Sequence, residues 1–544
     1  MEETKQGLLQ GKGATLGAHT LHYEMEDRVM LRVLQDRAND RGEHPWLICD
    51  LKDSLTFSEG WKLVCRIGGA LVRDGYEGSH VALLMRNQIE FMPSMHGTHA
   101  ARGVAIPLNA ESRGAHLKHM ITKGDASVII VRDEFLERIT DLDDIGLVTK
   151  IIVVGKAPEI QKIHKAEVVS FEKWIDGVNP ELPGELPNWD ETAVIQFTSG
   201  TTGLAKGAIC THHYFYLASA ILTDSLERSQ DDILFTPLPA FHVAALHFVA
   251  NLSIHAGCTG HLLSKFSPSK YFEQAAQAKA TFSIILGPMA VMIEKRTENV
   301  PEHCLEVIFC VPPPPGIENF EQRFNIELLW QSFGMTEIIP LPAPRHLLSD
   351  YPPGTLGHPA QWVEYGVVDD NDRLLPPNEI GELVFRTLIP NAMTTGYYKD
   401  PEITVEAFRN FMFHTGDLAF YDQNGAVLYK GRKQDRIRRR GEMVGAMEVE
   451  FIVLTNPNVL EAAVYGVPSE LGEEDIKLDI VSSKDIDLNE LRIWCEENLP
   501  RYMVPRYIEK RDSFPKTPSE RIEKHKLQDQ PLTRPEVADF EGNK

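Results

Sequence analysis

Short apolar runs alternate with helical patterns through the first part of the chain. Runs rich in Val, Ile and Leu occupy 81–85, 103–109, 126–131 and 150–154. Apolar positions recur at helical spacing over 27–37 and 57–72. Runs without polar alternation are typical of parallel strands covered on both faces. The pattern therefore predicts an α/β region built on a parallel sheet.

The middle of the chain continues this alternation and then changes. Strands are expected at 193–197, 207–210, 233–239, 282–288, 305–310 and 327–330, and helices at 247–255 and 271–278. From 354 to 385, turn residues separate short alternating runs, which predicts a β-rich subdomain. The polar first 25 residues and the tail from about Leu527 are expected to be loosely held.

The pattern changes again near Asp435. Strands are expected at 459–467 and 477–481 and a helix at 488–499, which indicates a separate unit. We predict an α/β fold with a large N-terminal domain, 1–434, made of α/β subdomains and the β-rich subdomain. A small α+β domain, 435–544, follows it. A length of 544 residues is too great for one ordinary core and fits this division.

Composition excludes several classes of protein. A formal net charge of -23 argues against nucleic acid as a partner, because phosphate binding requires a basic face. Seven scattered cysteines favour reduced thiols in a cytoplasmic protein. No apolar run reaches the length of about 18 residues that predicts a membrane span. The first residues lead into no apolar segment, so a secretory leader is not expected.

One loop between two predicted strands is rich in glycine and hydroxyl groups and carries one lysine. Glycine lets the backbone approach a ligand closely, and successive N–H groups form an anion-binding nest. The spacing is not that of a Walker A loop, and a flexible polar turn is the alternative interpretation. The candidate phosphate-binding residues are Thr198, Ser199, Gly200, Thr201, Thr202, Gly203 and Lys206.

In this order, Thr-Ser-Gly-Thr-Thr-Gly-x-x-Lys-Gly resembles the phosphate loop of the adenylate-forming (AMP-binding) superfamily. Further motifs follow in that superfamily's order over nearly the whole chain. The stretches 239–245 and 271–292 look most like the crotonobetaine/carnitine-CoA ligase branch. The resemblance implies an enzyme that joins a carboxylic acid to coenzyme A through an acyl-adenylate. The acid is a small molecule, and a bulky one is allowed. It implies ATP or acyl-AMP, Mg²⁺ and CoA as ligands.

The resemblance also implies a nucleotide and metal site. Asp417, which ends a Thr-Gly-Asp motif, matches the carboxylate that accepts hydrogen bonds from the ribose hydroxyls. Glu337 matches the carboxylate that holds Mg²⁺. Phe333 stands where the family usually has Tyr, so an aromatic face remains and a hydroxyl is lost. The nucleotide-contacting set implied in this way is Phe333, Gly334, Thr336, Asp417 and Arg432.

His242 resembles the histidine beside the carboxylate-binding site of these enzymes. The Asp that amino-acid-activating relatives carry near here is missing, which favours a plain carboxylic acid. A satisfied core histidine is the alternative interpretation. The small residues after His242 leave room for a bulky acid, and the candidate walls of this pocket are Val243, Ala244, Ala245, Trp330 and Ser332.

Two further positions concern the second half of such a reaction. Asp435 matches the hinge about which the small, mobile C-terminal domain of the family rotates, and Gly441 matches the glycine beside the pantetheine channel. Three arginines, 438–440, stand between them. They are expected either to meet CoA phosphates or to form a solvated charged strand.

Two departures from the family affect adenylation. The lysine that bridges the carboxylate and the α-phosphate is Arg521 here, and the preceding glycine is Glu520. Arginine is planar and bulky, so it replaces a point charge poorly. The adenine loop contains four prolines, 312–315, which lack N–H donors. With His242 and Glu337, Arg521 completes the expected catalytic set.

These departures suggest an adenylation-impaired enzyme that mainly converts pre-formed acyl-AMP, supplied by an upstream adenylating enzyme, to acyl-CoA. The alternatives are a full two-step ATP-dependent ligase, an amide synthetase and a non-catalytic acyl-AMP-binding protein. The oligomeric state is open, with a homodimer as one arrangement.

Overall fold

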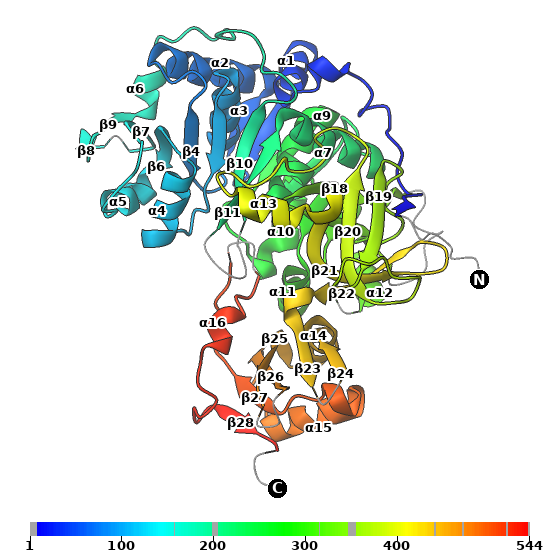
Figure 1. The fold of residues 1–544 in the computed structure, drawn as a ribbon. Helices are drawn as coiled ribbons and strands as arrows, with labels where there is room; N and C mark the ends of the chain where they lie inside the picture. The colour runs from blue at the N-terminus through cyan, green and yellow to red at the C-terminus, as the bar shows by residue number, and fades with distance from the viewer. Residues whose placement is uncertain are drawn as a thin grey trace.

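The computed structural model describes residues 8–156, 158–198, 205–314, 316–345, 355–439, 442–469, 473–517 and 521–541. Figure 1 shows a large body, coloured blue to yellow, and a small unit in orange and red below it. Within the described residues, no helix is long and apolar enough to cross a membrane.

An eight-stranded sheet forms one half of the body. Its inner strands pair in parallel, and the edge pairs β10–β11 and β8–β9 are antiparallel. The predicted parallel strands are thereby confirmed. The strand order is β11 (Lys206–Thr211), β10 (Thr192–Thr198), β5 (Val104–Pro107), β4 (His80–Leu84), β6 (Val128–Arg132), β7 (Lys150–Val154), β9 (Ala166–Ser170) and β8 (Lys162–Ile163).

A seven-stranded sheet forms the other half. All of its pairs are parallel except β2–β3, so the carboxyl ends of its central strands meet at one edge. In open α/β sheets this edge is where ligands bind. The order is β16 (Glu327–Leu329), β15 (Val307–Cys310), β14 (Phe282–Ile285), β12 (Ile233–Thr236), β13 (Thr259–Leu262), β2 (Pro45–Cys49) and β3 (Asp53–Thr56).

Helices cover both sheets and several lie deep in the core. In α2 a capping box between Thr56 and Glu59 satisfies the first N–H groups, which fixes where the helix begins. The helices of the body are α1 (Met30–Asp40), α2 (Phe57–Arg73), α3 (Phe91–Ala100), α4 (Gly114–Lys123), α5 (Leu136–Thr140), α6 (Phe171–Ile175), α7 (His212–Ser225), α8 (Val243–Ala245), α9 (Leu252–Ala256), α10 (Tyr271–Ala278), α11 (Gly287–Arg296), α12 (Ile317–Phe324) and α13 (Pro401–Ala407).

The helix predicted at 247–255 is not uniformly α-helical. Leu246–Asn251 is a π-helix, and α9 begins only at Leu252. Every residue of the π segment is buried, so the hydrophobic pattern does not distinguish one helical period from another. π segments are frequent at functional sites, and this one follows His242 by one turn.

The β-rich subdomain is an antiparallel sheet with a separate hairpin. The sheet order is β1 (Leu9–Gln10), β19 (Val363–Val368), β20 (Gly381–Thr387), β21 (Phe413–Tyr421) and β22 (Val427–Arg432). The hairpin consists of β17 (Ser332–Met335) and β18 (Ile338–Pro342). The predicted β-rich region is thus confirmed.

The N-terminal arm is held to the body, so the expectation that it is loose was wrong for the described residues. Leu9 pairs with Tyr365 through β1, and the Gly11 N–H donates to Val363 O at 2.8 Å. The Asp224 carboxylate accepts from the backbone N–H groups of His19 and Thr20, each at 3.1 Å. Backbone pairing and a buried carboxylate leave no trace in hydropathy.

The small unit has hydrophobic cores of its own, separate from that of the body. The tail was expected to be weakly ordered, but Leu527 is buried and β28 pairs with β27. We retain the domain boundary at Asp435 as a proposal. The elements are β23 (Arg436–Arg439), β24 (Glu442–Gly445), α14 (Ala446–Leu454), β25 (Val459–Pro468), β26 (Glu474–Ser482), α15 (Leu488–Asn498), β27 (Tyr507–Lys510), α16 (His525–Gln528) and β28 (Val537–Asp539).

Replacing Asp224 tests how firmly the arm is held. Asp224→Ala leaves the N–H groups of His19 and Thr20 without their acceptor, and we expect the free energy of unfolding to fall by about 1–3 kcal/mol. Chemical denaturation measures this. Asp231→Ala, at an exposed position, is the control and should change stability by less than about 0.5 kcal/mol. Equal stability of both variants would show that the arm contributes nothing.

Candidate active site

Two of the phosphate-loop candidates, Thr198 and Lys206, stand at the facing ends of the paired strands β10 and β11. Thr198 is paired with Lys206 at the end of the ladder, and its Oγ1 lies 3.5 Å from Lys206 O. Lys206 Nζ lies 5.5 Å from the centre of the Tyr397 ring. The residues between them, Ser199, Gly200, Thr201, Thr202 and Gly203, lie outside the described residues. The hairpin itself was predicted from the flanking apolar runs.

Glu337 is a buried carboxylate close to this hairpin. Tyr397 donates from its hydroxyl to Glu337 Oε1 at 2.8 Å. Burial raises the pKa of Glu337, while Tyr397 and the charges of Arg432 and Lys206 act in the opposite direction. A buried carboxylate facing cations is a suitable oxygen ligand for Mg²⁺. Tyr397 stands 60 residues from Glu337 in the sequence and was not among the predicted residues.

Asp417 is the second buried carboxylate. Arg432, its partner in the β21–β22 ladder, places Nε 3.0 Å from Asp417 Oδ1, and the Tyr429 hydroxyl donates to the same oxygen at 3.0 Å. Burial raises the pKa of Asp417 to about 6, although Arg432 and the Tyr429 hydrogen bond lower it. The predicted pair Asp417 and Arg432 is therefore in direct contact. Tyr429 lies in β22, the strand of Arg432, and was not among the predicted residues.

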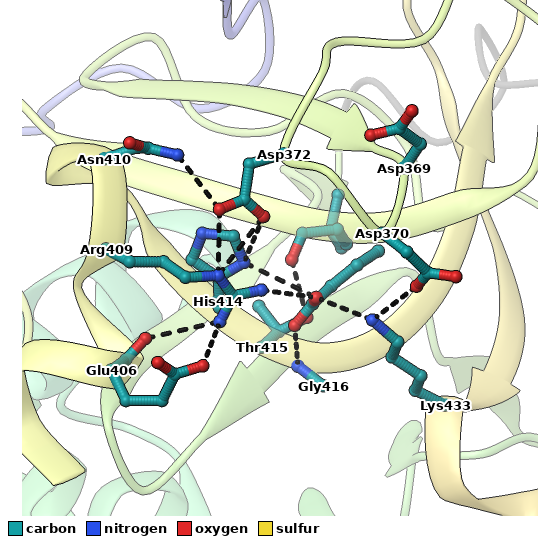
Figure 2. Close-up of polar contacts among 12 residues, drawn as sticks. Asp369, Asp370, Asp372, Glu406, Arg409, Asn410, His414, Thr415, Gly416 and Lys433 are labelled. Carbon is teal, nitrogen blue, oxygen red and sulfur yellow. Dashed lines mark hydrogen bonds and ion pairs between the residues drawn. The ribbon is translucent and has the colours of Figure 1, made fainter.

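A charged network, drawn in Figure 2, surrounds Gly416, the residue that precedes Asp417 in β21. Glu382 accepts from the Gly416 N–H at 3.0 Å and lies 3.4 Å from His414 Nδ1. Arg409 and Lys433 contact Glu382 Oε2 at 3.2 and 3.4 Å. Burial acts to raise the pKa of Glu382, but these partners outweigh it and lower the pKa to about 2. Glu382 is thus held ionised and fixes the backbone before Asp417.

Arg521 projects from the small unit into the same region. Its side chain is exposed to solvent. Burial and the charge of Arg432 lower its pKa, while Tyr429, Asp435 and Asp417 act to raise it. The loop is closed by hydrogen bonds from Thr517 N–H to Arg521 O at 2.7 Å and from Arg521 N–H to Thr517 Oγ1 at 3.1 Å. Glu520 lies outside the described residues.

The two lysines that follow Arg521 do not take its place. Lys524 Nζ lies 2.8 Å from Glu450 Oε1 and 3.8 Å from Asp435 Oδ2. Lys526 is exposed and pairs with Glu523. Asp435, the predicted hinge, therefore contacts the loop that carries Arg521.

His242 caps the N-terminus of α8 and is half-buried. Its Nδ1 accepts from the Ala244 N–H at 3.2 Å, so the neutral ring carries its proton on Nε2. Burial, and secondly the charge of Arg521, lower the pKa of His242 to about 4. A neutral imidazole at this point can donate from Nε2 to a carboxylate. The core-histidine alternative does not account for its half-open surface.

The other candidates for the acyl pocket and for adenine binding differ in how much of their side chains is exposed. Val243, Ala244 and Trp330 are half-buried, whereas Ala245 and Ser332 are buried and contribute little surface. Gly334 is exposed and Thr336 is half-buried, next to Glu337. Phe333 is also half-buried, and its ring lies 5.2 Å from the centre of Phe385. Phe333 therefore keeps part of its ring free.

The candidates for CoA binding are only partly described. Gly441 lies outside the described residues. Arg439 does not form part of a solvated strand, because it is buried and donates to Val504 O and to Glu541. Arg438 is exposed, with Nε 3.5 Å from Glu473. Of the described arginines, Arg438 therefore keeps a surface for an anion.

The fold is that of a two-part molecule, in which a small C-terminal unit brings Arg521 near residues held by the body. The AMP-binding enzyme model matches residues 34–398, and the model of the AMP-binding enzyme C-terminal domain matches residues 448–521. The chain therefore belongs to the AMP-binding enzyme family. The predicted superfamily, fold class and enzyme class of the acyl-CoA ligase type are confirmed at this level.

Curated and solved relatives agree with this assignment. A protein of Citrobacter koseri named crotonobetaine/carnitine–CoA ligase is 28% identical over 83% of this chain and 88% of its own length. The anthranilate CoA ligase AuaEII, solved with anthranoyl-AMP, superposes with a TM-score of 0.84 at 22% identity over 93% of this chain and 97% of that one. The o-succinylbenzoate CoA synthetase of Bacillus subtilis, solved with ATP and magnesium, gives a TM-score of 0.76 at 23% identity over 91% and 99%. The two structures share the fold.

The raised pKa of Asp417 predicts a pH-dependent affinity for the ribose. The carboxylate must be ionised to accept from two hydroxyls, so affinity should rise as the pH increases through about 6 and level off above it. Calorimetry with adenosine, which has no phosphate to titrate there, measures this. Asp417→Asn should bind more weakly and lose the step. A step of the same size in Asp417→Asn would assign the titration to another group.

Proposed function

We propose that this chain forms an acyl-CoA thioester from a carboxylic acid by way of an acyl-adenylate, and that adenylation is its slow half-reaction. The observation that carries the proposal is the direct contact of Asp417 with Arg432, near Arg521 of the small unit, whose charge also acts on His242. Curated relatives at 27–28% identity bear the name of CoA ligases, which supports the same chemistry.

In the first half-reaction the acid's carboxylate attacks the α-phosphorus of ATP and pyrophosphate leaves. Asp417 and Arg432 hold the ribose, and Thr198 and Lys206, at the ends of the paired strands, meet the phosphates. Glu337 is the residue that would hold Mg²⁺, which supplies charge neutralisation at the phosphates when bound. Arg521 stabilises the charge that moves between carboxylate and phosphate.

In the second half-reaction the CoA thiol attacks the acyl carbonyl and AMP leaves. His242 faces the carbonyl and can donate to it from Nε2, which stabilises the developing oxyanion. This step does not need Arg521. Supply of acyl-AMP by a separate adenylating enzyme is the variant of the proposal in which the first step is lost altogether.

Arg521→Lys tests the division between the two steps. A compact ammonium should bridge carboxylate and phosphate better than a planar guanidinium, so adenylation should rise by about 10²–10³-fold. Pyrophosphate exchange with acetate, hexanoate, benzoate and cinnamate measures this step. Thioester formation from the synthetic acyl-AMPs should change by less than about threefold, because Arg521 takes no part in it.

Two results would contradict this division. Robust exchange by the natural chain that Arg521→Lys does not increase would mean that arginine serves adenylation fully. Failure to form acyl-CoA from any of the four acyl-AMPs would remove the proposed thioester chemistry for those acids.

The acyl pocket should respond to a change in volume at Ala244. Ala244 is half-buried beside His242, so Ala244→Phe should fill the pocket and lower kcat/KM for cinnamate at least about tenfold. Acetate, which needs little room, is the matched control and should lose less than about threefold. The same loss for both acids would mean that Ala244 does not line the acyl pocket.

A further inference from the structure

Lys295, in the last turn of α11, joins the body to the small unit. Its ammonium lies 3.4 Å from Asn456 O and also donates to Val459 O. Asn456 lies in the short connection between α14 and β25, and Val459 is the first residue of β25. Figure 1 shows α11 ending at the face of the body that adjoins the small unit. The contact therefore spans two units with separate cores.

The acceptors are held rigidly. The Val459 N–H donates to Asn456 O at 3.1 Å, and the Asn458 N–H donates to Asn456 Oδ1 at 3.0 Å. Lys295 is half-buried, and burial lowers its pKa while Glu294 acts to raise it. An ammonium partly withdrawn from water requires oxygen partners. The two carbonyls supply them only while the small unit keeps this position.

The other end of α11 lies against the loop that contains Pro312. At Gly287, its first residue, an added Cβ would lie 2.6 Å from Pro312 O, in the loop that the family places against adenine. The first residue of α11 thus lies against the loop that contains Pro312, and its last turn contacts the small unit. The helix is a strut between the two.

The second half-reaction requires this contact to open. The charge of Arg521 acts on His242, beside which the thiol must approach the acyl carbonyl under the proposed function. The loop carrying Arg521 belongs to the small unit, as do Asn456 and Val459. When the small unit moves to withdraw that loop, Asn456 and Val459 move with it. The contact with Lys295, which belongs to the body, then breaks.

We propose that Lys295 is a positioning residue. It holds the small unit in the orientation that brings Arg521 close to Asp417 and His242, and so it favours adenylation over thioester formation. The inference rests on the proposed two-step function. Because the acceptors are backbone carbonyls, the contact depends on the side chain at 295 alone.

Lys295→Met removes the donors and keeps the apolar stem. We expect pyrophosphate exchange to slow by about ten- to a hundredfold, which is the range for losing a charged hydrogen bond. Thioester formation from benzoyl-AMP and CoA should stay the same or become faster. Lys295→Arg should restore exchange, and Arg296→Gln, which removes an exposed cation of the same turn, should leave both steps unchanged. A loss of both half-reactions together with a lower Tm would overturn the proposal.

A distance measurement separates this proposal from the proposed function. Cys304 is exposed and the other cysteines are buried, so spin labels can be placed on Cys304 and on Glu490→Cys in α15. Lys295→Met should broaden or shift the distance distribution. An unchanged distribution would overturn the role of Lys295 even in an active enzyme. A shifted distribution without any exchange or acyl-CoA formation would instead refute the proposed function.

Discussion

Two guanidinium groups from different parts of the chain converge on one buried carboxylate, and the site depends on this convergence. Arg432 reaches Asp417 through the register of two paired strands, so the body alone fixes that contact. Arg521 arrives only when the small unit is closed on the body. The pKa of Asp417 stays raised despite both cations, because burial outweighs them. The carboxylate is thus poised for neutral hydrogen-bond donors such as ribose hydroxyls.

The same arrangement assigns the two half-reactions to two positions of one unit. The chain is strongly acidic overall, with a formal net charge of -23. Lys206, Arg432 and Arg521 nevertheless bring positive charge to the surroundings of Glu337 and Asp417. That charge suits a polyphosphate. Under the proposed function the thiol needs an open approach to the acyl carbonyl instead, from which the Arg521 loop must withdraw. A strut that ends in a single side-chain contact at Lys295 can hold the first position without preventing the second.

Much of the fold could be predicted because buried parallel strands leave continuous apolar runs, and the motif order named the family. Asp417 and Arg432, predicted from separate motifs, are in direct contact in the structure. Tyr397, Tyr429 and Lys295 were missed, because their partners are distant in sequence or are backbone atoms. The arm held at Asp224 and the strand that orders the tail were missed because backbone pairing leaves no hydrophobic pattern. The π segment after His242 was missed because every residue in it is buried.

We propose that the carboxylic acid becomes linked to AMP before it meets the thiol. Carboxylate labelled with ¹⁸O on both oxygens, incubated with the protein, Mg-ATP and CoA, tests it directly. Attack of the carboxylate on the α-phosphorus followed by thiolysis must leave one ¹⁸O in the phosphate of AMP, and mass spectrometry should find it there in a one-to-one ratio to acyl-CoA. Acyl-CoA formed together with unlabelled AMP, or with the label in inorganic phosphate, would contradict the account.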